Sequence, residues 1–136
     1  MFGIAIRNSL KSLSVTILFV LAGCAVNNNS LQPKDLAACL AVNGVKIDYI
    51  SPLEPAMLYA DAGMELCISG KRVAAYRFNT DLEVQRKRLA RIKKNKYVYI
   101  MGLKFPAIVH GSYVLVNVNS NPQKHRIIAA FKHFEM

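Results

Sequence analysis

Several residue patterns that mark enzymes and metalloproteins are missing from this chain of 136 residues. Its three histidines never fall in a metal-ligand spacing such as H-x-x-x-H. There is no G-x-S-x-G sequence around a serine nucleophile and no glycine-rich phosphate loop. The sequence therefore predicts a protein that is not an enzyme, with no catalytic residue, no metal site and no cofactor.

Long hydrophobic runs are missing as well, because no apolar stretch reaches the ~20 residues that span a hydrocarbon core. Arg7 and Lys11 instead precede a short apolar stretch, LSVTILFVL at 13–21, and small residues follow it. This order is typical of a secretory signal peptide. We therefore expect residues 1–23 to be cleaved, with an uncleaved signal anchor as the alternative.

The leader ends in Leu21-Ala22-Gly23-Cys24, which resembles the lipobox of bacterial lipoproteins. The resemblance implies cleavage between Gly23 and Cys24, a lipid on the Cys24 thiol and, usually, acylation of the new amine. Two or three acyl chains together hold a protein stably on a bilayer. Ala25 implies sorting to the outer membrane, facing the periplasm, with the inner membrane and the cell surface as alternatives. A free core cysteine at position 24 is the competing interpretation.

Acidic residues are scarce, since 8 Asp and Glu stand against 18 Lys and Arg and give a formal net charge of +10. In a cytosolic protein this balance would suggest nucleic acid. Behind a lipoprotein signal, nucleic acid is not an expected partner. The partners within reach are the membrane itself, anionic lipid, wall polymers and acidic faces of envelope proteins.

Cysteine is rare, with three in the chain. If Cys24 carries lipid, Cys39 and Cys67 are the only possible pair, and an oxidising periplasm permits their disulfide. Closing that loop would stabilise the fold by about 3–4 kcal/mol in the chain-entropy model. Two separate buried thiols are the alternative.

The mature chain has the length of one domain. We expect a lipidated, Asn-rich tether at 24–34 and a single globular domain at 35–136. The pattern predicts an α+β fold, with an antiparallel sheet of about five or six short strands and two helices on one face. Helices are expected at 33–43 and 79–96, although Asn43-Gly44 also suits a hairpin turn. Strands are expected at 45–50, 57–60, 65–69, 72–78, 97–101, 113–118 and 126–131.

The second expected helix is unusually basic and is predicted to begin with a capping box from Thr80 to Glu83. Hardly any acids sit one helical turn away to relieve the repulsion among its cations. Tyr97 and Tyr99 follow the helix directly. The pattern predicts a surface for a polyanion or protein partner, and a merely solvated face is the alternative. The candidate binding residues are Arg86, Lys87, Arg88, Arg91 and Lys94.

These features together predict a membrane-anchored lipoprotein that acts as a non-catalytic binding or assembly component of the cell envelope. A secretion, conjugation or outer-membrane complex is the kind of assembly expected. The alternative is an immunity or exclusion lipoprotein that neutralises an incoming toxin or element.

Overall fold

The computed structural model of the chain describes residues 26–136. The predicted signal peptide, Gly23 and Cys24 therefore lie outside the described residues. The elements in chain order are α2 (Pro33–Val42), β1 (Ile47–Pro52), the 3₁₀ helix η1 (Pro55–Leu58), β2 (Ala62–Ile68), β3 (Lys71–Arg77), α3 (Glu83–Asn95), β4 (Tyr97–Ile100), β5 (Leu103–His110), β6 (Tyr113–Val116) and α4 (Lys124–Lys132).

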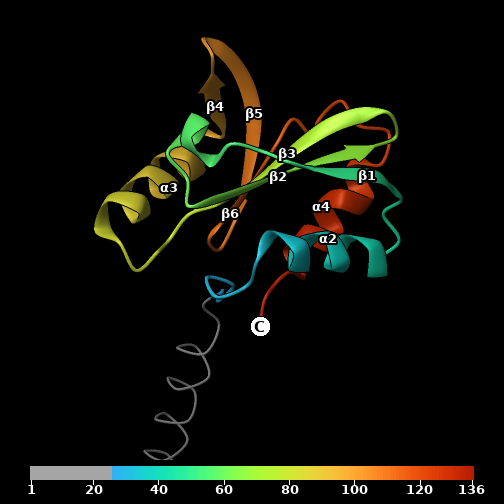
Figure 1. The fold of residues 1–136 in the computed structure, drawn as a ribbon, viewed down its shortest axis with the longest axis horizontal. Helices are drawn as coiled ribbons and strands as arrows, with labels where there is room; N and C mark the ends of the chain where they lie inside the picture. Colours follow the sequence, from blue (N-terminus) through green and yellow to red (C-terminus); the bar gives the residue numbers. More distant parts are fainter. Residues whose placement is uncertain (1–25) are drawn as a thin grey trace, which may run out of the picture.

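The strands form one six-stranded sheet in the order β1-β2-β3-β6-β5-β4, and every neighbouring pair is antiparallel. Strand β5 has two partners along its length. Its first half, to Pro106, pairs with β4, and its second half, from Ala107, pairs with β6. The described residues thus form a small single α+β domain, as predicted (Figure 1).

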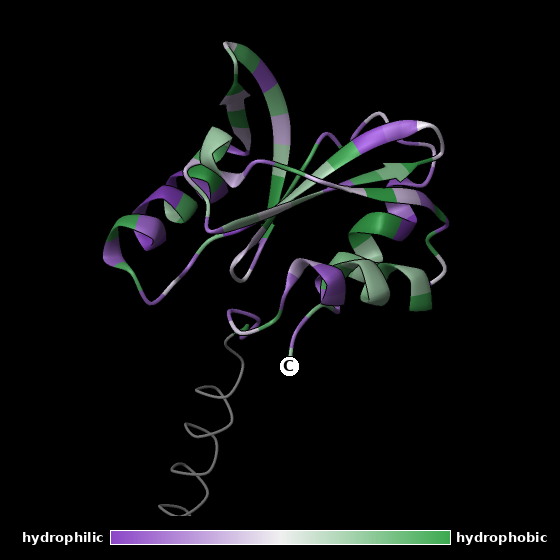
Figure 2. Ribbon diagram, in the orientation of Figure 1, coloured by the Kyte–Doolittle hydropathy of each residue, from purple (hydrophilic) through white to green (hydrophobic). Residues whose placement is uncertain are grey.

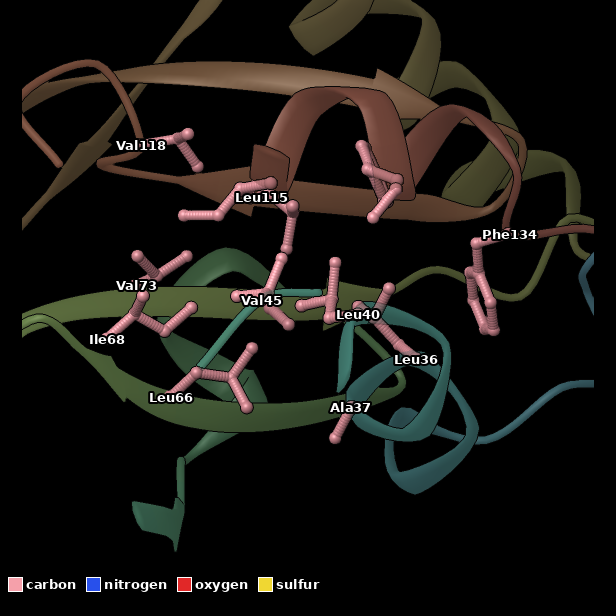
Figure 3. Packing of buried hydrophobic residues seen from close by; sticks show 14 of the residues in the cluster. Leu36, Ala37, Leu40, Val45, Leu66, Ile68, Val73, Leu115, Val118 and Phe134 are labelled. Carbon is pink, nitrogen blue, oxygen red and sulfur yellow. The ribbon is translucent and has the colours of Figure 1, made fainter. Parts of the chain in front are cut away.

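The helices cover both faces of the sheet, so the expectation of two helices on one face is wrong. Alternate residues of a strand point to opposite faces. Val73 and Ala75 of β3 join the cluster beneath α2 and α4, whereas Tyr76 joins the cluster that contains Leu58 of η1 and Leu89 of α3. Figure 3 shows the first cluster, in which Leu36, Ala37 and Leu40 of α2 gather with the strand residues Leu66, Ile68 and Leu115.

Three local predictions were wrong for identifiable reasons. The expected strand at 126–131 is helix α4, because its buried residues recur at helical spacing: Ile127, Ala130 and Phe131. Residues 105–112, predicted as a turn between the expected strands at 97–101 and 113–118, lie largely in β5 (Leu103–His110) despite Pro106. Residues 57–60, expected as a strand, form none: Met57 and Leu58 end η1, which Pro55 begins, and Tyr59 and Ala60 follow it.

The predicted tether at 24–34 is also wrong from Asn27 onward, because this segment is docked on the domain. Asn28 is fully buried, and its Nδ2 donates to the carbonyl oxygens of His110 (3.0 Å) and Phe134 (2.9 Å). Its Oδ1 accepts from the Ser112 backbone N–H at 2.7 Å. The Met136 N–H donates to Asn27 O at 3.0 Å, so both described chain ends meet here.

Leu31 fixes the same segment a few residues later. The Tyr113 hydroxyl donates to Leu31 O, and Arg77 Nη1 donates to the same oxygen at 3.2 Å. Burial raises the pKa of Tyr113 to about 12, so the hydroxyl keeps its proton and remains a donor throughout the neutral range. The segment that was expected to be a flexible linker is therefore part of the folded domain.

Cys39 and Cys67 are both free thiols, which contradicts the predicted disulfide between them. Leu66 and Ile68 of β2 face the cluster beneath α2, so Cys67 between them faces the other side of the sheet. Cys39 lies on α2, with its Sγ 3.7 Å from Ala130 O. The sheet therefore separates the two sulfurs, and burial raises the pKa of the Cys39 thiol, which keeps it protonated.

Candidate functional site

Helix α3 is the basic helix predicted from the sequence, and Figure 2 shows it as the most hydrophilic of the helices. Its one buried residue is Leu89, which packs in the second cluster. The predicted capping box is absent, because the N-cap is Leu82 and no side chain caps it. Thr80 instead donates its N–H to Asn29 Oδ1 at 3.0 Å, which ties the start of this helix to the docked amino-terminal segment.

The predicted binding residues do not share one face of α3. Arg88 and Arg91 line a groove between α3, η1 and β4. Arg86 and Lys87 line a shallower hollow on the other flank of the helix. Arg86 Nη1 donates to Thr80 O at 2.8 Å, Lys87 Nζ pairs with Glu83 at 3.2 Å, and Lys94 is exposed.

The groove that Arg88 and Arg91 line has a volume of about 510 Å³ and is here called the arginine–tyrosine groove. The Arg88 guanidinium stacks over the Tyr59 ring at 4.6 Å, a cation–π contact that holds its charge at the surface. Asp and Glu are not among the described residues that line the groove. Its lining is Met57, Leu58, Tyr59, Arg88, Arg91, Ile92, Asn95, Tyr97, Val98 and Tyr99.

The tyrosines of β4 form the far side of this groove. The rings of Tyr97 and Tyr99 meet edge to face at 5.4 Å, and Lys104 Nζ lies 4.1 Å from the centre of the Tyr97 ring. Tyr59 and Tyr99 are 65% and 58% exposed, although they are large aromatic residues. Exposed tyrosine beside arginine is the composition that is enriched in protein interfaces and their energetic hot spots.

The β4–β5 hairpin extends the same surface. Its turn residues Met101 and Gly102 both have positive φ, 51° and 79°, as a two-residue turn that matches the strand twist requires. Met101 and Leu103 are 84% and 63% exposed at the tip. Figure 1 shows this tip at one end of the molecule and the first described residues and the C terminus at the other.

The sequence identified Arg88 and Arg91 as candidates and showed Tyr97 and Tyr99 directly after the helix, but it gave no indication of Tyr59. Tyr59 is 29 residues from Arg88 and reaches it only because η1 packs beside β4 and α3. Its backbone is left-handed, with a φ of 57°, where it caps η1. No pattern near Tyr59 indicates that it faces the basic helix.

The groove is open, the Arg88 side chain and the tyrosine rings are held by neighbours, and no carboxylate neutralises Arg91 within the lining. No helix within residues 26–136 has both the length and the apolar character to cross a bilayer. No protein-family model, curated protein or solved structure matches the chain.

Proposed function

We propose that this chain is a lipid-anchored envelope protein that binds a protein partner without catalysis, as a component of an envelope assembly. The observation that carries the proposal is the arginine–tyrosine groove, which is open, has a volume of about 510 Å³ and is lined by Arg88, Arg91 and three tyrosines. The lipobox resemblance at Leu21–Cys24 supports the anchor and the outer membrane as its location.

The partner surface that fits this groove is acidic. Arg88 and Arg91 offer planar guanidinium groups that bind carboxylates in a bidentate manner. Tyr59 and Tyr99 supply large exposed rings that lose little conformational entropy on binding. A carboxylate-bearing partner segment placed across these rings would satisfy the cations and cover the aromatic area together.

The docked segment limits how an anchored domain would be oriented relative to the membrane. The chain from Cys24 to Asn27 spans at most about 10 Å when fully extended. Because Asn28 is buried in the domain, an anchored domain stays next to the bilayer instead of moving on a loose tether. The β4–β5 tip, at the end of the molecule away from Asn28, would then face the periplasm and its proteins (Figure 1).

The anchor is tested by replacing Cys24 with serine and following labelled palmitate in cells that express the full chain. We expect Cys24→Ser to abolish labelling and to leave the precursor uncleaved, because the thiol accepts the first lipid. Cys39→Ser is the matched control and should label like the parent chain. Undiminished label in Cys24→Ser would contradict the anchor.

The partner is tested by photo-crosslinking in cells, with a benzophenone side chain placed at Tyr99. We expect this position to capture one acidic envelope protein that co-purifies with the chain as a stable complex. A benzophenone at Tyr49, an exposed tyrosine of the opposite edge strand β1, is the matched control and should capture little.

The identity of the captured protein separates the alternatives. Capture of a stable envelope complex supports the assembly role. Capture of a single secreted toxin would contradict the assembly role and support the immunity role. Equal capture from Tyr49 and Tyr99 would contradict the arginine–tyrosine groove as the docking surface.

A further inference from the structure

A second hollow, of about 500 Å³, lies between α3, β5 and α4 and takes no part in the proposed docking surface. It arises where β5 changes partners, because β4 pairs only with the first half of β5 and ends its pairing at Pro106. Beside the second half of β5, the end of α3 and the face of α4 form the walls. We call this hollow the lysine-rimmed groove.

The floor of the lysine-rimmed groove is aliphatic and aromatic. Ile108 of β5 and Ile128 of α4 are half-buried there, and Phe131 is buried beneath them. Val109 points to the opposite face of the sheet and lines the side of the hollow next to α3. The remaining lining residues are Pro106, Ala107, His110, Leu115, Val118 and Asn119, together with three lysines. Side chains that remain half-exposed in a hollow of this size give an apolar ligand a place to displace water.

The three lysines give the groove a single sign of charge. Lys93 lies in α3, Lys96 caps the C-terminal end of that helix and Lys132 lies in α4, so cations approach the hollow from two sides. The described lining contains neither Asp nor Glu. Three ammonium groups around an apolar floor repel one another, and an anion bound among them would relieve that repulsion.

His110 adds a polar group at the same place. Its Nε2 is buried without a hydrogen-bond partner among the described residues, and the nearest carboxylate oxygen, from Glu135, is 3.6 Å away. The ring is held edge to face against Phe131 at 5.7 Å between centroids. Glu135 does not line the groove, so this nitrogen is directed at the C-terminal segment and the ligand proposed below does not depend on it.

We propose that the lysine-rimmed groove binds a single-chain amphiphile, an acyl chain on its floor and an anionic head group among Lys93, Lys96 and Lys132. An acidic peptide would pair its backbone N–H and C=O groups with the edge of β5 that has no strand neighbour beyond Pro106, and absence of acyl-chain label at this site would favour that occupant. An acyl chain has no such groups and gains from covering Ile108 and Ile128. This site is independent of the arginine–tyrosine groove and of the proposed partner.

The test uses the full chain in phosphatidylcholine nanodiscs with a dodecanoate probe that carries a diazirine at the end of its chain. After irradiation, mass spectrometry should place the label on the β5 segment 106–109 and the α4 segment 128–132. An excess of dodecyl phosphate should remove most of the label. Dodecyl maltoside, which has the same chain and a neutral head, and inorganic phosphate, which has no chain, should each leave most of it.

Two variants and one matched control complete the design. Ile128→Trp fills the floor and should abolish labelling, and Lys93→Gln/Lys96→Gln/Lys132→Gln should lower it at least about fivefold. Lys34→Gln/Lys46→Gln/Lys94→Gln removes the same charge outside the groove and should label like the parent. Equal loss in this control, equal competition by dodecyl maltoside, or label concentrated on Met101 and Leu103 would overturn the proposal.

Discussion

Replacing Asn28 with alanine is expected to lower the free energy of unfolding by about 3–5 kcal/mol, because a buried group left without its hydrogen bond costs about 1–3 kcal/mol. Asn28 is 0% exposed and serves three backbone groups: His110 O, Phe134 O and the Ser112 N–H. Alanine provides none of these bonds. The result would be measured by urea denaturation of the full chain, followed by circular dichroism.

The control for this experiment is Asn119→Ala, which changes an exposed asparagine and should alter stability by less than about 0.5 kcal/mol. Gly111→Ala gives an independent check, since its new Cβ would lie 2.3 Å from Asn28 Oδ1 and its φ is +60°. Part of that clash disappears when Asn28 is also alanine. The double variant should therefore lose less than the sum of the two single losses, and a loss below about 1 kcal/mol for Asn28→Ala would contradict the docked segment.

Reversing the charge of Arg88 and Arg91 together is expected to weaken capture of the crosslinked partner by at least about 100-fold. Loss of a hot-spot arginine costs about 2 kcal/mol or more, and a reversed charge adds repulsion of the partner's carboxylates. The dissociation constant of the purified complex, measured at constant ionic strength, reports the effect. Arg88→Glu also removes the cation–π contact with Tyr59.

The matched control is Arg86→Glu/Lys87→Glu, which makes the same change in net charge on the other flank of α3. Binding in this control should fall by less than about tenfold, through weaker long-range attraction alone. If the two double variants weaken the partner equally, the attraction comes from the total charge of the helix. The arginine–tyrosine groove would then not be the docking surface.

The class of the fold and most of its strands were predictable because their signals are local. Alternation in 45–50 and 72–78 indicates half-buried strands, and β1 and β3 form there with boundaries shifted by a few residues. Helix α4 was missed because β-branched and aromatic residues at 126–131 favour a strand. Burial of Ile127, Phe131 and Phe134 on one face stabilises the helix instead.

The candidate site was predictable only in part. The density of cations at 86–94 identified α3, but the division of those cations between two flanks depends on how α3 lies over β5 and η1. The lysine-rimmed groove depends on a change of strand pairing at Pro106, which no residue pattern indicates. The docking of Asn28 was missed for a similar reason, since an Asn-rich stretch ending at a proline is typical of a loose linker.

The attachment of Asn28 also determines how the domain responds to mechanical force. A pull on the chain ahead of Val26 first loads the bond from the Met136 N–H to Asn27 O and then the three hydrogen bonds of Asn28, two of which join it to the β5–β6 turn and one to the C-terminal segment. The strand pairs of the sheet carry load only after these bonds and the two bonds to Leu31 O break. The bonds of Asn28 therefore bear tension applied at the amino-terminal end before that tension reaches the sheet.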